Sequence, residues 1–219
     1  QVGNGFAVPF LEQPGEALEQ AIANAKACGG LIRTPAEWLA HPQGQYLSAI
    51  PVIEIRKVRD GAPKPIASTT RPLDGVRTLD LTRILAGPIA GRTLAEHGAD
   101  VLMVTAPHLP QVTEHVRDTS HGKRSCFLDF EISKQAEIFR DLVATADVII
   151  DGYRPGALTK KGFGREQLFD LCPGLIHLSV SCFGSGGPFK DRAGWEQIAQ
   201  AVTGVCHTHG DAVGAGQPQ

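Results

Sequence analysis

The stretch TLDLTRILAGPIAGRTLAEHGADVLMV, Thr78–Val104, decides the fold because two different periodicities follow each other in it. Residues 76–81 have the composition of a buried strand, and residues 86–97 have the spacing of a helix that Gly98 ends. A second apolar strand follows at residues 100–104. A strand, a helix and a strand in this order are typical of a βαβ unit, whose two strands are parallel.

The same alternation continues toward the end of the chain. Further elements are expected in this order: strand 126–130, helix 133–146, strand 147–151, short helices 154–162 and 164–171, strand 175–184 and helix 194–204. The sequence therefore predicts an α/β fold, with a Rossmann-like, mostly parallel sheet and flanking helices.

The residues before this region have another character. Thr34, Pro35 and Glu37 have the spacing of a capping box at a helix start. Polar and apolar residues alternate within residues 50–58, IPVIEIRKV, as in a strand with one solvent-exposed face. Three parts are expected: residues 1–58 as the C-terminal part of a small α+β domain, 59–72 as a linker, and 73–219 as an incomplete Rossmann-like domain. Since the chain begins at Gln1 and its single methionine is Met103, it is expected to be a piece of a longer protein.

Composition argues against several classes of function. The net charge of −2, the scattered basic residues and the 6% aromatic content argue against a nucleic-acid-binding surface. No apolar run approaches the roughly 20 residues that span a bilayer, so no membrane partner is expected. The five cysteines form no C-x-x-C pair, which suits a reducing, intracellular compartment, either cytoplasm or organellar matrix. His207, His209 and Asp211 invite a metal hypothesis, but a polar loop is favoured and no metal is expected.

Ligands of an open parallel sheet bind beyond the carboxyl ends of its strands. The loop TRILAGP offers Gly87 and Pro88 at a helix start, where free N–H groups favour an anion. The alternative is a well-made helix start, with Gly91 for close packing. The G-x-G-x-x-G fingerprint is absent, which argues against NAD. The loop SCFGSGGPF lacks the lysine of a P-loop, so a hinge or tight turn is favoured.

Basic residues follow two other predicted turns. Lys123 and Arg124 precede a strand, and the segment YRPGALTKK places Lys160 and Lys161 after Tyr153. A planar ring beside cations suits an adenine and phosphates. The alternative is that these are solvated surface charges.

Taken together, these loops resemble family III CoA-transferases, the CaiB/BaiF group of formyl-CoA transferase, carnitine CoA-transferase and α-methylacyl-CoA racemase. The resemblance runs from Arg71 to Gly204 and rests on RPLDGVRTLDLTRILAGPIAGRTLAEHGADVL, GKRSCFLDF, ADVIIDGYRPGALTKKGFG and LIHLSVSCFGSGGPFKDRAGWEQIAQAVTG. The segment RTPAEWLAHPQG resembles the small-domain stretch of longer, two-part members.

The resemblance implies coenzyme A, as CoA or acyl-CoA substrate, at the strand ends. It implies these contacts: Arg83, Ile84, Leu85 and Ala86 in the first loop, Lys123 and Arg124 in the basic turn, Gly152 and Tyr153 at the adenine, and Lys160 at a phosphate. Two positions depart from the family pattern: Thr105 replaces a glutamate, and Gly152 replaces an asparagine.

For the intact protein the resemblance implies transfer of CoA between an acyl-CoA and a carboxylic acid acceptor through an aspartyl-CoA intermediate. The nucleophilic aspartate is expected beyond Gln219, so no catalytic residue is assigned here, and an interlocked homodimer is expected. Trp195 occupies the position of the racemase histidine and cannot carry a proton, which disfavours racemisation. A catalytically inactive remnant or assembly partner that keeps the fold is the alternative, and a racemase-type or NAD-dependent enzyme is weaker.

Overall fold

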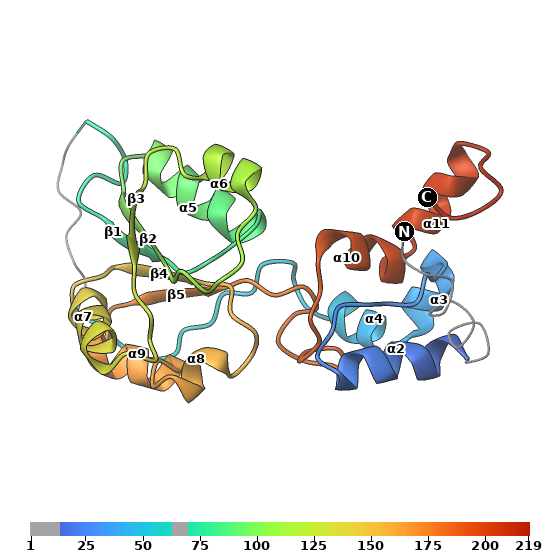
Figure 1. Cartoon of the computed structure of the whole chain (residues 1–219), viewed down its shortest axis with the longest axis horizontal. Helices are drawn as coiled ribbons and strands as arrows, with labels where there is room; N and C mark the ends of the chain where they lie inside the picture. Colours follow the sequence, from blue (N-terminus) through green and yellow to red (C-terminus); the bar gives the residue numbers. More distant parts are fainter. Residues whose placement is uncertain (1–13, 63–69) are drawn as a thin grey trace. The chain divides into compact units, whose positions relative to one another are not determined.

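The computed structural model describes residues 14–62 and 70–219 (Figure 1). The chain forms two compact units, and each is described by itself: residues 56–180 form one, and residues 1–55 with 181–219 form the other. This grouping differs from the expected boundaries, because the segment after residue 180 packs with the N-terminal helices. Part of the expected linker, residues 63–69, lies outside the described residues.

The unit of residues 56–180 contains a five-stranded parallel sheet, as the sequence predicts. Its strands are β1 (Arg77–Asp80), β2 (Asp100–Thr105), β3 (Arg124–Phe127), β4 (Val148–Asp151) and β5 (Ile176–Ser179). Their order across the sheet is β3-β2-β1-β4-β5. The chain therefore moves outward in one direction after β1 and in the other direction after β4. The carboxyl ends of β1 and β4 meet at this change of direction, where open α/β sheets bind ligands.

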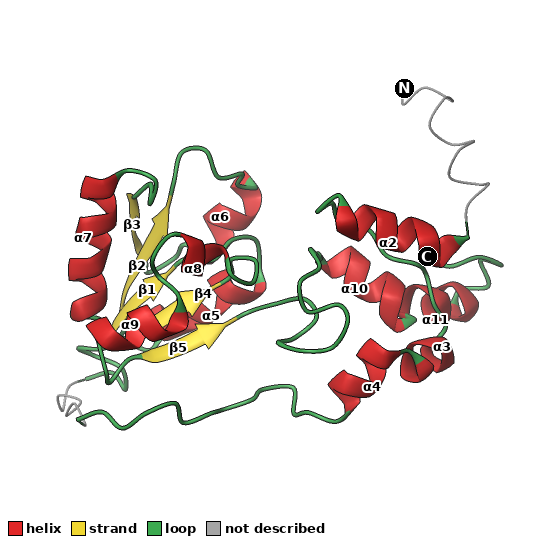
Figure 2. Ribbon diagram, turned by 90° about the horizontal axis from the view of Figure 1, so that it is seen from below, coloured by secondary structure: helices red, strands yellow, loops and turns green. Residues whose placement is uncertain are grey.

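Helices cover both faces of the sheet (Figures 1 and 2). One face carries α5 (Ala86–Glu96) and α6 (Thr113–Thr119), and the other carries α7 (Ser133–Ala144) and α9 (Arg165–Leu171), with α8 (Ala157–Lys160) after β4. The main core lies on the α7 side, where Phe139, Phe163 and Ile149 are fully buried. The rings of Phe139 and Phe163 meet edge to face, with centroids 4.8 Å apart. The sequence did not predict α6.

The second unit is helical in its described residues. It contains α2 (Gly15–Asn24), α3 (Pro35–Ala40), α4 (Pro42–Ser48), α10 (Glu196–Thr203) and α11 (Val205–Ala212). Trp38, Phe183, Phe189 and Val202 form its buried core. The predicted capping box is confirmed, because Thr34 Oγ1 accepts from Glu37 N at 3.2 Å and the Glu37 carboxylate accepts from Thr34 N at 2.7 Å.

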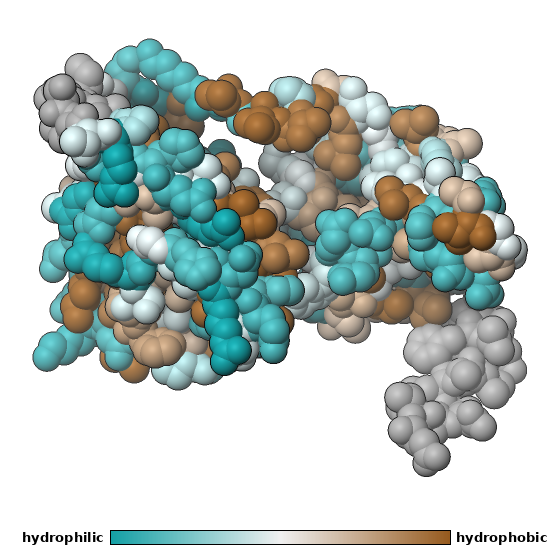
Figure 3. All heavy atoms as spheres, turned by 90° about the horizontal axis from the view of Figure 1, so that it is seen from above, coloured by the Kyte–Doolittle hydropathy of each residue, from teal (hydrophilic) through white to brown (hydrophobic). Residues whose placement is uncertain are grey.

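Two predictions outside the parallel sheet are wrong. Residues 50–58 form no strand, and the side chains of Val52, Ile53 and Ile55 are exposed. A strand needs a neighbouring strand for its backbone hydrogen bonds, and in the described part of this unit the only β pairing is an isolated bridge between Cys28 and Ala193. The expected small α+β domain is therefore helical there. Figure 3 shows hydrophobic and hydrophilic residues interspersed on the face of the protein that it displays.

The second wrong prediction concerns the segment HTHGD, which is helical within α11 rather than a polar loop. His207 Nδ1 lies 3.1 Å from Asp211 Oδ2, one helical turn away. Among residues 14–62 and 70–219, no three His, Cys, Asp or Glu side chains are placed to hold a metal ion. Within the same ranges, no helix has the length and apolar character needed to cross a bilayer.

Candidate functional site

The loop between β1 and α5 stands at the carboxyl edge of the sheet. Leu85 caps α5 without a side-chain hydrogen bond, and Ala86 is the first residue of this 11-residue helix. The first N–H groups of a helix have no partner within it, and they carry the positive end of the helix dipole. Ile84 has a φ of 79°, which a β-branched residue rarely adopts. The loop therefore presents a positive helix end in a strained, specific conformation.

Asp80 organises the base of this loop. Its side chain is buried, and its Oδ1 accepts hydrogen bonds from Thr82 N at 3.0 Å and Thr82 Oγ1 at 2.5 Å. A Cβ at Gly87 would lie 2.4 Å from Thr82 Cβ. Gly87 thus lets the start of α5 approach Thr82, which supports the helix-start interpretation of the motif. Asp80, the last residue of β1, thus has a structural role at the base of the loop.

The turn after β4 lies beside this loop. Asp151 Oδ1 accepts from Tyr153 N at 2.8 Å, so the strand's last residue fixes the turn that follows it. A Cβ on Gly152 would lie 3.2 Å from Thr82 Cγ2. The turns after β1 and β4, which are far apart in sequence, therefore touch at the point where the strand order reverses.

Tyr153 brings an aromatic ring to this place. Its ring packs against the main core, and burial raises the pKa of its hydroxyl, whereas the positive charges of Arg83 and Lys161 act to lower it. The carboxylates of Asp151 and Asp129 act in the opposite direction, so charges of both signs surround the ring. Lys161 also pairs with Glu131, while Lys160 is exposed at the end of α8. A half-buried ring beside cations and a helix N-terminus can hold a flat group joined to an anion.

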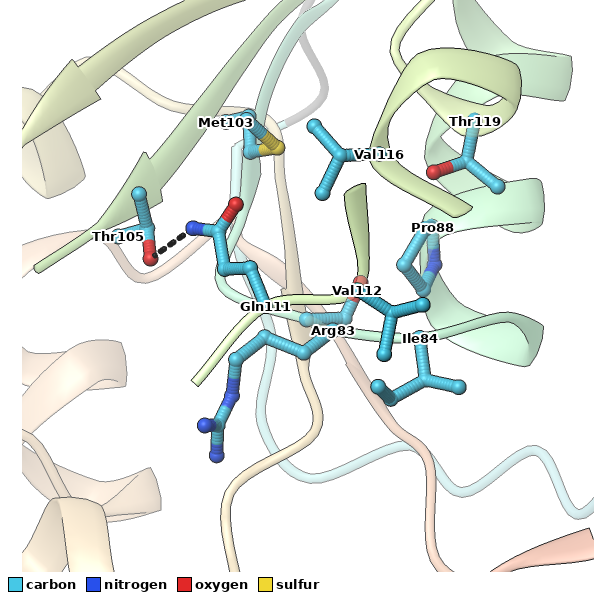
Figure 4. A pocket seen from close by; sticks show the side chains of 10 residues that line it. Arg83, Ile84, Pro88, Met103, Thr105, Gln111, Val112, Val116 and Thr119 are labelled. Carbon is cyan, nitrogen blue, oxygen red and sulfur yellow. Dashed lines mark hydrogen bonds between the residues drawn. The ribbon is translucent and has the colours of Figure 1, made fainter. Parts of the chain in front are cut away.

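A small cavity adjoins the first loop (Figure 4). Its volume is about 20 Å³, enough for one water-sized group. Gln111 Nε2 donates to Thr105 Oγ1 at 2.9 Å across its polar side. Figure 4 shows the guanidinium of Arg83 pointing away from Val116 and Thr119, so Arg83 is directed out of the cavity. The other lining residues are Thr82, Ile84, Pro88, Met103 and Val112.

The two basic residues at the turn before β3 are both paired with carboxylates. The side chain of Lys123 is buried, and its Nζ lies 2.7 Å from Asp80 Oδ2. Arg124 is the first residue of β3, and its guanidinium pairs with the carboxylate of Asp100 at the beginning of β2. The expected set therefore separates: Arg83, Ile84, Leu85, Ala86, Gly152 and Tyr153 lie together, with Lys160 in the helix that follows. Lys123 lies beneath the first loop, paired with Asp80, whereas Arg124 pairs with Asp100 away from it.

Residues 73–219 match the family described as CoA-transferase family III. The chain belongs to this family. It is 32% identical to an acetyl-coenzyme A transferase, nodX, of Hypoxylon pulicicidum, over 88% of this chain and 35% of the relative. It is 33% identical to human succinyl-CoA:glutarate CoA-transferase, over 68% of this chain and 37% of the relative.

A solved structure has the same fold. The crystal structure of a CaiB/BaiF family protein from Brucella suis covers 63% of this chain at 37% identity with a TM-score of 0.56, and 40% of that protein is matched. The chain thus spans little more than a third of the curated relatives named above. The recognition of the family and of its α/β fold from the sequence is confirmed.

In this CoA-transferase family member, the glycine-rich loop SCFGSGGPF is held by a side chain that sequence reasoning missed. Gln43 is fully buried, and its Nε2 donates to the carbonyl oxygens of Phe183 at 2.8 Å and Gly186 at 3.0 Å. Gly187 has a φ of 77°, and a Cβ there would meet Gln43 Oε1. The loop is therefore held in one bent conformation, which ends in a hydrogen-bonded turn from Gly187 to Lys190. A glutamine within a helix gave no local signal of this distant role.

Proposed function

We propose that this chain supplies the CoA-binding part of an enzyme that moves CoA between carboxylic acids. The observation that carries the proposal is the contact of the turns after β1 and β4 at Thr82 and Gly152. It brings the free end of α5, the Arg83 cation and the Tyr153 ring to one edge of the sheet. An adenine on the ring and phosphates near the cation and the helix end would use each of these groups.

The reaction of the complete enzyme would pass through an aspartyl-CoA intermediate. An aspartate carboxylate attacks the acyl-CoA carbonyl, giving a mixed anhydride and the CoA thiolate. The thiolate then attacks the aspartyl carbonyl, which releases the donor carboxylate and leaves an aspartyl-CoA thioester. The acceptor carboxylate repeats the two steps in reverse and leaves as its CoA ester. The chain's own contribution is to hold CoA during both exchanges, and a homodimer is proposed for the complete protein by its family resemblance.

Calorimetric titration of the 219-residue chain with CoA tests the proposal. We expect saturable binding, and we expect Arg83→Ala to weaken it roughly tenfold, since one charge-assisted contact is lost. Arg165→Ala is the matched control, because Arg165 is an exposed arginine at the start of α9. Absence of binding by the unaltered chain, or equal effects of the two substitutions, contradicts the proposal.

A further inference from the structure

Lys123 points into the protein rather than toward solvent. Its Nζ donates to Asp80 Oδ2 and to the carbonyl oxygen of Pro88, each at 2.7 Å. Both side chains of the Lys123–Asp80 pair are 1% exposed. Charged groups removed from water are retained only when partners replace the lost hydration. The ammonium group thus has two fixed protein partners, one charged and one neutral.

The two partners lie at opposite ends of one loop. Asp80 ends β1, and Pro88 lies in the first turn of α5. Asp80 also accepts two hydrogen bonds from Thr82, so its two oxygens hold the loop and the lysine separately. Through Lys123, the end of the strand is joined to the start of the helix. The segment between them is the loop that carries Arg83.

The joined loop contains backbone strain. Ile84 has a φ of 79°, and such a conformation persists only where the surrounding contacts determine it. The packing against the pair is also close. A Cβ on Gly91 would lie 2.5 Å from Asp80 Oδ2 and 3.1 Å from Lys123 Nζ. The absence of a side chain at Gly91 therefore lets α5 approach the buried charges, and these charges hold the helix start in place.

We propose that Lys123 is a positioning residue for the ligand loop and makes no contact with a ligand phosphate. Together with Asp80 and Pro88, it holds the loop in the conformation in which Arg83 and the N-terminus of α5 are available to a ligand. The identity of the ligand rests on the proposed function, whereas the effect on the loop is a property of the unliganded chain.

Amide hydrogen exchange of the unliganded 219-residue chain tests the effect on the loop. In Lys123→Met, the amides of residues 82–90 are expected to exchange roughly tenfold faster while those of β4 keep their rates, because only the loop loses its tie. Lys134→Met, at an exposed lysine on α7, is expected to change neither region. Unchanged exchange at 82–90, or equal acceleration of the loop and β4, would overturn the proposal.

Titration with two ligands separates positioning from direct contact. Lys123→Met is expected to weaken CoA and 3′-dephospho-CoA by the same factor, roughly tenfold, because the whole loop is less preorganised. A greater loss for CoA than for 3′-dephospho-CoA would show that Lys123 contacts the 3′-phosphate, and it would overturn the proposal. If the unaltered chain binds neither ligand, the proposed function fails, and the exchange rates still decide the role of Lys123.

A second variant protects the test against simple misfolding. Lys123→Met alone leaves the Asp80 carboxylate buried without its cation, which is costly. Lys123→Met combined with Asp80→Asn removes both charges and is expected to fold, with the same fast exchange at 82–90. Failure of both variants to fold would overturn the proposal, because the pair would then serve the whole unit rather than its loop.

Discussion

Phe189 N donates to Gln43 Oε1 over 2.7 Å, although the two residues are 146 positions apart in the chain. The Nε2 atom of the same Gln43 side chain donates to two carbonyl oxygens in the glycine-rich loop. The Gln43 side chain is fully buried, and its hydrogen bonds with Phe183 O and Phe189 N are buried as well. One side chain near the beginning of the chain therefore shapes a loop near its end, and joins the two segments into one unit.

Replacing Gln43 with leucine should destabilise the helical unit strongly. Leucine keeps much of the volume but leaves two carbonyls and one N–H without partners, so the free energy of unfolding should fall by about 2–4 kcal/mol. Urea denaturation followed by circular dichroism measures this change. Gln45→Leu is the control, since Gln45 is exposed and lies on the same helix. Similar stability of the two variants would show that the Gln43 bonds contribute little.

The buried pair of Glu19 and Arg33 should make stability depend on pH. Burial alone raises the pKa of Glu19, but hydrogen bonds from Arg33 and Leu31 N outweigh it and lower the pKa from 4.5 to about 2. A pKa that is lower in the folded state gives stabilisation that is complete above about pH 4.5 and is lost as pH falls toward 2.

Chemical denaturation at pH 6 and pH 3 checks this expectation. Between these values the unaltered chain should lose on the order of 2 kcal/mol from Glu19, and Glu19→Gln should show a correspondingly smaller loss. Glu16→Gln, at an exposed position of the same helix, should keep the full dependence. An equal pH dependence in all three proteins would contradict the assignment to Glu19.

Local patterns were sufficient to predict the parallel sheet. Helical and strand periodicities are properties of short segments, so the region from Thr78 to Val104 was enough to predict a strand, a helix and a second strand. Residues 50–58 show where this reasoning ends: alternation predicted a strand, but a strand also needs a partner, which a short segment does not encode. The formation of α6 likewise had no clear local signal.

The candidate site was predicted where it depends on position along a strand, and not where it depends on distant partners. Arg83 and Tyr153 follow strands that end at the same edge, so a topological rule placed them together. Lys123 was grouped with them by its charge and by the family resemblance. Its partner Asp80 is 43 positions away, and the pairing became visible only in the folded chain.

The strain at Ile84 should be measurable as an unusual tolerance of glycine. Because glycine adopts positive φ freely, Ile84→Gly should gain about 1 kcal/mol from relief of strain, which offsets the loss of a half-buried side chain. Ile89→Gly, one turn into α5, relieves nothing and should cost about 1 kcal/mol. Thermal unfolding of both variants compares them. A greater loss for Ile84→Gly than for Ile89→Gly would argue against strain.

Alanine at Gly91 should destabilise the sheet unit despite its better helix propensity. A methyl group there would lie 2.5 Å from Asp80 Oδ2, and neither Asp80 nor Lys123 can move without losing buried hydrogen bonds. Overpacking of this kind should lower the free energy of unfolding by about 1–3 kcal/mol. Thr93→Ala, at an exposed position of α5, should instead raise it by a few tenths of a kcal/mol. Denaturation curves of the two variants therefore have opposite expected shifts, and a stabilising Gly91→Ala would mean that α5 can withdraw from the buried pair.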